Sequence, residues 1–267
     1  MACTISAAEI KRVKALGFLN NKGTDLFNAR VITVNGKITA QQIDQLCLAH
    51  QQDPTAEHTV QPGMVYLSNP TELGTIYTLA ELEEIRKVTQ RYGLFLFLDG
   101  TRLGCALAAA ENDVTLPDLG RLCDAFYLGG TKMGALFGEA LVLTHPALKQ
   151  DFRYQIKQRG GMLAKGRLLG IQFEALLDNG LYFDIGSHCV ALAMKLKKAF
   201  QEKGYPLLVD SPTNQQFPIL PNQVLERLKP VCTWSLQGHP DPEHTAVRFC
   251  TSWATTQEEI DQIIGLL

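Results

Sequence analysis

Two kinds of hydrophobic pattern alternate along the first half of the chain. Short runs of consecutive apolar residues predict buried strands, and segments in which apolar residues recur every three or four positions predict amphipathic helices. The expected strands are residues 30–34, 64–68, 94–98, 125–128 and 140–143. The expected helices are residues 39–50, 78–92 and 116–122. Because strands and helices alternate, we expect an α/β fold with a mostly parallel sheet and helical crossovers.

The most apolar of these runs, residues 94–98, leads directly into Asp99-Gly100-Thr101-Arg102. Five apolar residues without alternation predict a strand that is buried on both faces. Its polar end is then the carboxyl end of a central strand, where open α/β sheets bind their ligands. A second polar segment, which contains Lys132 among glycines, follows the strand expected at residues 125–128. We therefore expect Asp99 and Lys132 to face each other across one site.

The pattern changes after Pro146, where long helices are expected over residues 152–177 and 182–204, with interruptions near Gly160-Gly161 and Asn179-Gly180. Short strands are then expected at residues 207–209, 216–220, 231–236 and 246–251. Further helices are expected from Pro221-Asn222 and over residues 256–267. These elements predict a small α+β domain over residues 180–267, beside a large domain over residues 28–179.

Residues 1–27 fit this organisation poorly. A helix is expected over residues 4–16, because Ser6 can act as its N-cap and Glu9 follows three residues later. Gly17 and the polar residues 20–23 end that pattern. We therefore treat residues 1–27 as an atypical N-terminal segment.

Composition narrows the class of protein. The chain of 267 residues is 46% hydrophobic and 19% charged, which is typical of a soluble globular protein. Its formal net charge of −2 and the absence of a basic run argue against nucleic acid and membrane partners. The seven cysteines form no CxxC pair, so we expect reduced thiols, a cytoplasmic location and no metal site. No apolar run reaches membrane-spanning length, and no secretory signal is expected.

Lys132 and Asp99 are the candidate catalytic residues. A lysine nucleophile needs a confined setting that keeps its amine partly neutral, and the Gly-Gly-Thr-Lys-x-Gly segment supplies one. Alternatively, Lys132 is an ordinary lysine of a surface loop. The segment is not a Walker loop, because the GxxxxGK(S/T) spacing is absent. Asp99 alone fits a helix cap, an ion-pair partner or a ligand for a buried cation. The guanidinium of Arg102 suits a carboxylate or phosphate, or an ion pair with Asp99 or Glu111.

Together, a lysine nucleophile and a partnered acid are the minimum for pyridoxal 5'-phosphate chemistry. The lysine forms a Schiff base with the cofactor, and the acid keeps the pyridine nitrogen protonated. The protonated ring can then accept electrons from the α-carbon of an amino acid. The pair is therefore a more specific signal than either residue.

Four segments make the sequence similar to the β-eliminating lyase/threonine aldolase family of fold-type I pyridoxal-phosphate enzymes. They are Phe97-Leu98-Asp99-Gly100-Thr101-Arg102-Leu103-Gly104, Tyr127-Leu128-Gly129-Gly130-Thr131-Lys132-Met133-Gly134-Ala135, Ser68-Asn69-Pro70-Thr71-Glu72-Leu73-Gly74-Thr75-Ile76-Tyr77 and Arg248-Phe249-Cys250-Thr251-Ser252-Trp253. The resemblance covers roughly residues 28–267. It implies a fold-type I large domain that binds the cofactor, incomplete at its N-terminus, followed by a small C-terminal domain.

The resemblance also implies roles for individual residues. Lys132 would form the Schiff base, and Asp99 would pair with the pyridinium nitrogen. Arg102 would lie beside the cofactor and help to bind the substrate carboxylate, for which Arg248 would be the second arginine. Asn69 would reach the ring hydroxyl of the cofactor.

By the same resemblance, Thr131 would contact the phosphate of the cofactor. The implied reaction is the retro-aldol cleavage of a β-hydroxy-α-amino acid such as threonine to glycine and an aldehyde. Two alternatives stay open: a truncated or inactive relative that acts only as a dimer partner, and β-elimination or racemisation on the same cofactor. The family implies a homodimer or homotetramer.

The N-terminal region departs from the family pattern. Family members carry there a turn that binds the cofactor phosphate and a histidine that stacks on the pyridine ring. Upstream of Phe27 no such turn is recognisable, and the first histidine is His50. We therefore expect the Schiff-base half of the site to be present, the phosphate-and-stacking half to be absent, and the cofactor to bind weakly.

Overall fold

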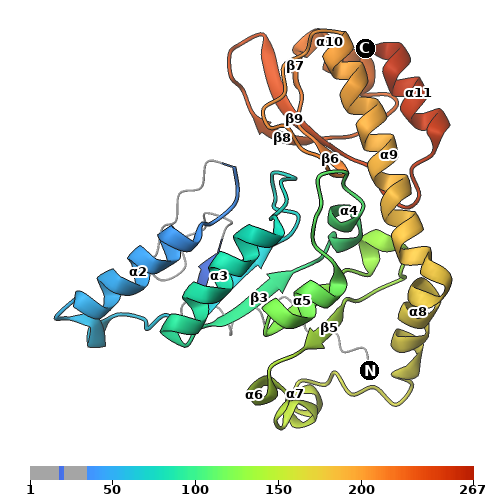
Figure 1. Ribbon diagram of the computed structural model, residues 1–267. Helices are drawn as coiled ribbons and strands as arrows, with labels where there is room; N and C mark the ends of the chain where they lie inside the picture. Colours follow the sequence, from blue (N-terminus) through green and yellow to red (C-terminus); the bar gives the residue numbers. More distant parts are fainter. Residues whose placement is uncertain (1–17, 21–34) are drawn as a thin grey trace.

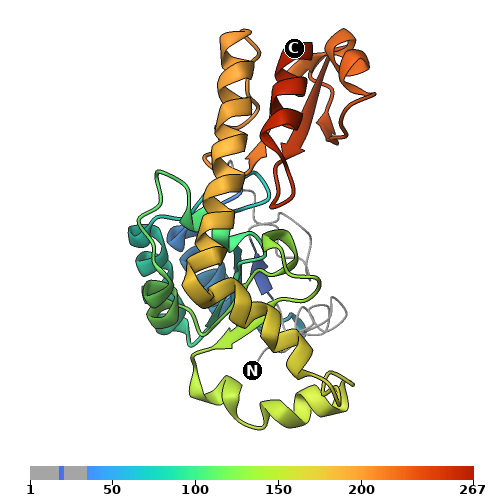
Figure 2. The same cartoon turned by 90° about the vertical axis from the view of Figure 1, so that its right-hand side faces the viewer.

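The computed structural model describes residues 18–20 and 35–267. Figure 1 shows a larger part that contains one sheet, a smaller part stacked on it, and the long helix α9 (Leu181–Glu202) beside both. Figure 2 shows α9 along its length, running from the larger part to the smaller one. The strand expected at residues 30–34 and the helix expected at residues 4–16 lie outside the described residues.

The larger sheet has five strands in the order β1-β2-β3-β4-β5. They are β1 (Phe18–Asn20), β2 (Met64–Ser68), β3 (Phe95–Asp99), β4 (Ala125–Leu128) and β5 (Ala140–Leu143). Strands β1 to β4 are parallel, and β5 is antiparallel to β4. The mostly parallel α/β sheet expected from the sequence is confirmed. Strand β1 lies where the sequence indicated only the end of a helical pattern. Its place in the sheet comes from its parallel backbone pairing with β2.

Three helices connect these strands: α2 (Ala40–Gln52), α3 (Leu79–Tyr92) and α5 (Leu116–Leu122). Each begins after a threonine whose hydroxyl accepts a backbone hydrogen bond in a capping box, namely Thr39, Thr78 and Thr115. Helix α3 ends at Gly93, which has a φ of 66° that favours glycine. The three expected helices and their starting points are therefore confirmed.

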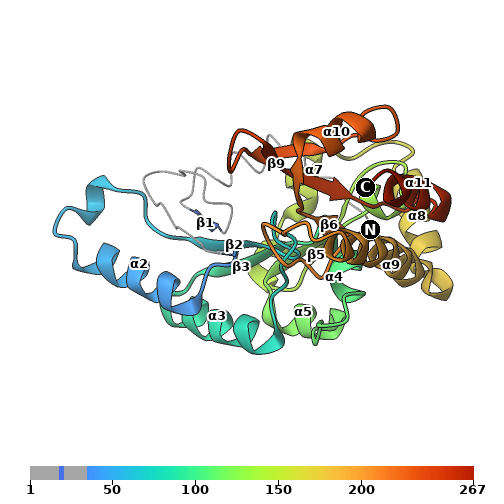
Figure 3. The ribbon, with the colours of Figure 1, turned by 90° about the horizontal axis from the view of Figure 1, so that it is seen from above.

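Helices α2, α3 and α5 lie on one face of the sheet (Figure 3). Their inward side chains pack on the buried side chains of Val65, Leu67, Leu96 and Leu98. Phe95 and Phe97, which point to the other face, stay partly exposed. The prediction that strand 94–98 is buried on both faces is therefore wrong for the described structure, because these three helices cover only one face.

The smaller sheet is antiparallel and is built around β9 (His244–Cys250). Its other strands are β6 (Gln215–Gln216), β7 (Ile219–Pro221) and β8 (Ser235–Gly238). Helices α10 (Asn222–Leu228) and α11 (Gln257–Leu266) pack on it with α9. The expected small α+β arrangement is observed, and Thr256 caps α11 as the pattern predicted.

Three expected strands of this region are wrong, divided or shortened. Residues 216–220 form the two strands β6 and β7 instead of one. Residues 207–209 form only an isolated bridge, from Leu207 to Pro218, since Pro206 and Pro218 have no N–H group with which to extend a ladder. In the segment 231–236, the amides of Val231 and Cys232 instead donate to the carbonyl of Leu228 at the end of α10, both at 3.0 Å. The strand therefore begins only at Ser235.

The remaining helices of the described residues follow in chain order. They are η1 (Ala56–His58), α4 (Leu103–Leu107), η2 (Thr131–Met133), α6 (Pro146–Lys149), α7 (Phe152–Gln158), α8 (Arg167–Leu177) and η3 (Asp178–Gly180). Helix α9 approaches α4 closely, because a Cβ atom on Gly186 would lie 2.3 Å from the carbonyl oxygen of Gly104. This contact fixes α9 against the segment that follows Asp99.

Candidate active site

The polar loops after β2, β3 and β4 meet at one edge of the sheet. These strands are parallel, so their carboxyl ends lie together. The amide of Asn69 donates to the carbonyl of Asp99, and the amide of Gly129 donates to the carbonyl of Gly100, both at 3.0 Å. These bonds bring Asn69, Asp99 and the loop that carries Lys132 into one region.

Among the described residues, the side chains of Tyr66 and Thr101 hold the carboxylate of Asp99. The hydroxyl of Tyr66 donates to Oδ2 at 2.5 Å, and the amide and hydroxyl of Thr101 donate to Oδ1. Tyr66 itself stacks on Phe97, with ring centroids 5.2 Å apart. Burial, and then the charge of Asp99, raise the pKa of Tyr66, so the phenol stays protonated and remains a donor. Asp99 is therefore oriented as an acceptor.

Lys132 lies in the half-buried turn η2 at the centre of the site. Burial and then the charge of Arg102 lower the pKa of Lys132, while the carboxylates of Glu72, Asp99 and Glu139 raise it. The burial effect is the largest, so the amine is deprotonated more readily than an exposed lysine. Lys132 is also within electrostatic reach of both Asp99 and Arg102.

The loop around Lys132 is anchored by Glu139. The amide of Gly130 donates to Oε2 of Glu139 at 2.6 Å, and the hydroxyl of Thr131 donates to Oε1 at 3.2 Å. A Cβ atom on Gly130 would lie 2.4 Å from the carbonyl oxygen of Gly138, so the tight loop requires glycine there. Burial raises the pKa of Glu139. Glu139 is thus a site residue to which the sequence analysis gave no role.

Arg248 reaches the site from strand β9 of the smaller sheet. Its Nη1 lies 3.3 Å from Oε1 of Gln215 and 3.6 Å from a carboxylate oxygen of Glu72. Its Nη2 donates to the hydroxyl of Ser235 at 3.4 Å. Among the described residues, its buried Nε has no hydrogen-bond partner. The guanidinium therefore keeps hydrogen-bonding capacity for a ligand.

Asn69 has a similar capacity. Its side chain is buried at 1% exposure, and its Oδ1 accepts a hydrogen bond from the amide of Tyr77 at 3.1 Å. Its Nδ2 has no hydrogen-bond partner within the described part of the chain. Because a buried N–H group without a partner is costly, this donor points to a ligand.

The sequence analysis did not assign roles to Tyr66, Glu72 and Glu139. Glu72 belongs to one of the four segments that carry the resemblance, and Glu139 follows a glycine beyond the lysine loop. The position of Glu72 depends on contacts with Arg248, which is distant in sequence, and that of Glu139 on a turn that returns it to Gly130. For Tyr66 no signal in the sequence was available, since alternation along β2 gives only the face on which its side chain lies.

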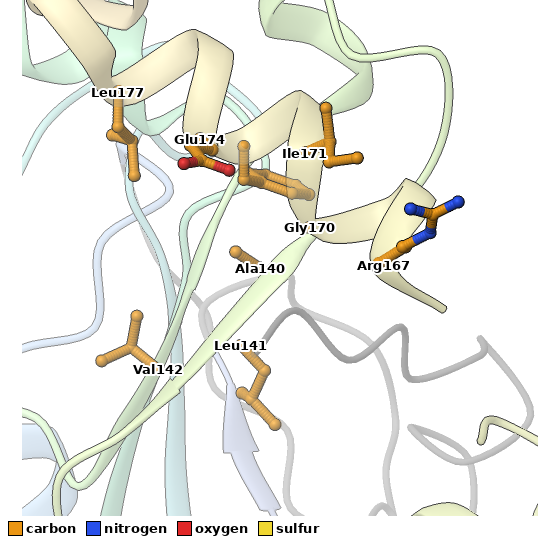
Figure 4. A pocket seen from close by; sticks show the side chains of 9 residues that line it. Ala140, Leu141, Val142, Arg167, Gly170, Ile171, Glu174 and Leu177 are labelled. Carbon is orange, nitrogen blue, oxygen red and sulfur yellow. The ribbon is translucent and has the colours of Figure 1, made fainter. Parts of the chain in front are cut away.

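A groove of about 530 Å³ lies between β5 and α8 (Figure 4). It is lined by Ala140, Leu141, Val142, Arg167, Gly170, Ile171, Phe173, Glu174 and Leu177. None of the predicted site residues lines it.

Over the described residues, no three histidine, cysteine, aspartate or glutamate side chains are grouped to hold a metal ion. No described helix is long and apolar enough to cross a membrane.

The sheet topology, with a lysine in the loop after β4 and an aspartate at the end of β3, defines a fold-type I α/β protein. The chain belongs to the β-eliminating lyase family, whose sequence profile, described as "Beta-eliminating lyase", matches residues 5–219. The match begins within residues 1–27, the segment that was expected to be atypical.

The relatives are threonine aldolases. A solved structure of Leishmania major threonine aldolase is 41% identical with a TM-score of 0.84, over 89% of this chain and 68% of that one. Low specificity L-threonine aldolase from Pseudomonas sp. is 27% identical over 92% of this chain and 68% of its own length. The enzyme of the same description from Pseudomonas aeruginosa is 28% identical, over 85% and 64%. The chain thus spans about two thirds of the length of these relatives.

The family implies the use of pyridoxal phosphate, and the residues present fit this cofactor. Lys132 offers an amine whose pKa is lowered by burial, for an aldehyde. Asp99 offers an oriented carboxylate for a pyridine nitrogen, and Asn69 offers an unpaired buried donor for a ring hydroxyl. Thr131, the residue expected near the phosphate, uses its hydroxyl to bond Glu139.

Proposed function

We propose that this chain is a pyridoxal-phosphate-dependent lyase that cleaves a β-hydroxy-α-amino acid, such as threonine, to glycine and an aldehyde. One observation carries the proposal. Lys132, with a pKa lowered by burial, lies within electrostatic reach of Asp99, whose two carboxylate oxygens are both fixed by donors. The relatives described as threonine aldolases supply the expected substrate and reaction.

Each site residue has a defined part in this reaction. Lys132 is the amine that holds the cofactor, because its lowered pKa increases the neutral, nucleophilic fraction. Asp99 keeps a proton on the pyridine nitrogen, and Tyr66 and Thr101 keep the carboxylate aimed. When bound, the cofactor supplies an electron-accepting ring for the pair of electrons left on the α-carbon.

Substrate binding is assigned to the two arginines. Arg248 has a buried Nε without a partner and can take the amino acid carboxylate in a two-pronged hydrogen bond. For Arg102 the described structure contains no ion pair with Asp99 or Glu111, so its guanidinium can share that role. Asn69 donates its free amide hydrogens to the cofactor ring.

The first experiment is an absorbance titration with pyridoxal phosphate, before and after borohydride reduction. We expect a visible Schiff-base band that reduction traps, and its loss in a Lys132→Ala variant. Lys157→Ala is the matched control, because Lys157 is an exposed lysine on α7. If Lys132→Ala retained a trapped Schiff base at the wild-type yield, the assignment of Lys132 would be refuted.

Product analysis tests the reaction. Glycine and acetaldehyde from threonine support the retro-aldol cleavage, whereas ammonia and a keto acid would show β-elimination in its place. We also infer a homodimer or homotetramer, as the family suggests, and light scattering of the purified chain tests this. A monodisperse monomer that is fully active would contradict it.

A further inference from the structure

Glu72 is near both Arg248 and Lys132, the two residues assigned to the substrate carboxylate and to the cofactor. It lies on the loop after β2, its carboxylate is 3.6 Å from Nη1 of Arg248, and its side chain is 48% exposed. The same carboxylate raises the pKa of Lys132 and of Tyr66, so it is within electrostatic reach of both. Glu72 thus faces Arg248 and is close enough to Lys132 to act on its charge.

The loop that carries Glu72 is held rigidly by the smaller part of the molecule. The hydroxyls of Ser211 and Thr213 both donate to the carbonyl of Gly74 at 3.1 Å, and the side-chain amide of Gln215 donates to the carbonyl of Thr71 at 3.1 Å. A Cβ atom on Gly74 would lie 2.2 Å from the hydroxyl oxygen of Ser211. The backbone on both sides of Glu72 is therefore fixed, which a positioned catalytic group requires.

An amino acid α-carbon carries a carboxylate, a nitrogen and a side chain, and Arg248, Lys132 and Glu72 offer one group for each. With the carboxylate at Arg248 and the nitrogen at the position served by Lys132, the third substituent, which carries the β-hydroxyl, can be directed at Glu72. Resting on the proposed function, we propose that Glu72 is the general base that accepts the proton of the substrate β-hydroxyl.

The proton and electron balance of this step is complete. Glu72 takes the hydroxyl proton as the Cα–Cβ bond breaks, and the O–H electron pair forms the C=O bond of the aldehyde. The pair from the Cα–Cβ bond stays on the α-carbon, which takes one proton to give glycine. Glu72 returns the proton it received, so no oxidant or further reactant is needed.

The other two described acids near Lys132 orient or anchor parts of the protein itself. Asp99 accepts hydrogen bonds from Tyr66 and Thr101, and Glu139 accepts them from Gly130 and Thr131. Glu72 instead faces an arginine that has unused donor capacity. When a substrate carboxylate takes over Arg248, the Glu72 carboxylate loses part of its ion pair and gains basicity.

The histidines bond elsewhere. Nε2 of His188 lies 2.8 Å from the carbonyl of Thr255, and His145 packs against Phe95 at the start of β3. Nδ1 of His244 contacts Asp241, and Nδ1 of His239 contacts Thr245. None of these contacts involves Lys132 or Arg248, so we assign the base to a carboxylate that does face Arg248.

The test is a Glu72→Gln variant of the cofactor-loaded chain, which removes the base but keeps the shape of the side chain. We expect kcat for threonine cleavage to fall about 10²-fold or more, with KM unchanged or lower because Arg248 loses a competing anion. Exchange of the α-proton of glycine needs no hydroxyl base, so its rate should stay within about threefold of wild type. Glu57→Gln, at a side chain that is 84% exposed, is the matched control.

Two further measurements separate a base from a structural residue. Glu72→Asp should recover part of kcat, since it restores a carboxylate on a shorter side chain. In the cofactor-free chain, modification of Lys132 by an amine reagent should shift to lower pH in Glu72→Gln, because a carboxylate that raises the pKa of Lys132 is gone.

The possible outcomes are distinct. The inference is overturned if Glu72→Gln keeps the wild-type kcat, or if cleavage and glycine exchange fall by the same factor. Failure of the proposed function shows in the wild type: a chain that binds the cofactor and exchanges the glycine proton but does not cleave threonine would overturn both. Failure of the Glu72 assignment alone shows only in the variant.

Discussion

The buried ion pair between Arg86 and Asp124 should be far more important for stability than the exposed pairs. Arg86, on α3, donates to both carboxylate oxygens of Asp124, at 2.8 and 3.1 Å. The amide of Leu96, in β3, donates to the same carboxylate at 2.7 Å. The side chains of Arg86 and Asp124 are only 18% and 4% exposed. This pair joins α3 to the two strands that lead to the candidate active site.

The perturbation is Arg86→Met, which keeps most of the side-chain volume but leaves the Asp124 carboxylate buried without its cation. Removal of one partner of a buried ion pair costs about 3–5 kcal/mol. The matched control is Arg121→Met. Arg121 also pairs with a carboxylate at 2.8 Å, that of Glu83, but the two side chains are 50% and 40% exposed. Loss of this exposed pair should cost about 0–1 kcal/mol.

The assay is urea-induced unfolding, followed by fluorescence and circular dichroism. If the slopes of the transitions are equal, the difference between the midpoints reports the difference in free energy of unfolding. We expect the Arg86→Met transition at a clearly lower urea concentration than that of Arg121→Met. The reasoning is refuted if the two variants differ by less than about 1 kcal/mol in the free energy of unfolding.

Two further substitutions test the site and its support. Glu139→Gln removes a carboxylate that raises the pKa of Lys132, so the pH profile of Lys132 modification should move to lower pH, whereas Glu174→Gln on the exposed face of α8 should leave it unchanged. Gly74→Ala should lower the free energy of unfolding by about 1–3 kcal/mol, since the new methyl group meets a buried hydroxyl and φ is +73°. Gly120→Ala, which meets nothing within 4 Å on a helix, should be neutral or stabilising; an equal loss in both glycine variants would contradict the packing argument.

Much of the larger part could be predicted because its signals are local. The capping threonines of α2, α3 and α5 and the apolar run of β3 act through neighbouring residues, so their effects are visible in the sequence. The same holds for Asp99 and Lys132, since parallel strands bring their carboxyl ends to one edge. The expectation that the two residues share a site needed only that rule.

The remainder depends on contacts that no local pattern records. Residues 207–209 have the composition of a strand but pair only at one bridge, because prolines interrupt the ladder. Glu72 acquires its role only because loops distant in sequence converge on Lys132, and Glu139 acquires its role because its segment folds back on Gly130. The partial exposure of Phe97 reflects which face of the sheet the described helices cover, and alternation along the strand does not give that information.

One path of side-chain contacts connects the two sheets through the candidate site. The guanidinium of Arg248 bonds Gln215, the amide of Gln215 bonds the carbonyl of Thr71, and Glu72 follows Thr71 and returns to Arg248. Because this path is closed, a shift of the smaller sheet moves the proposed carboxylate-binding arginine and the proposed base together. Covalent bonds limit the distance between the substrate carboxylate and its β-hydroxyl to a narrow range, so a site that binds both must keep its own two groups within a matching separation. The closed path gives that constancy, and it explains why residues of the smaller sheet contribute to a site at the edge of the larger one.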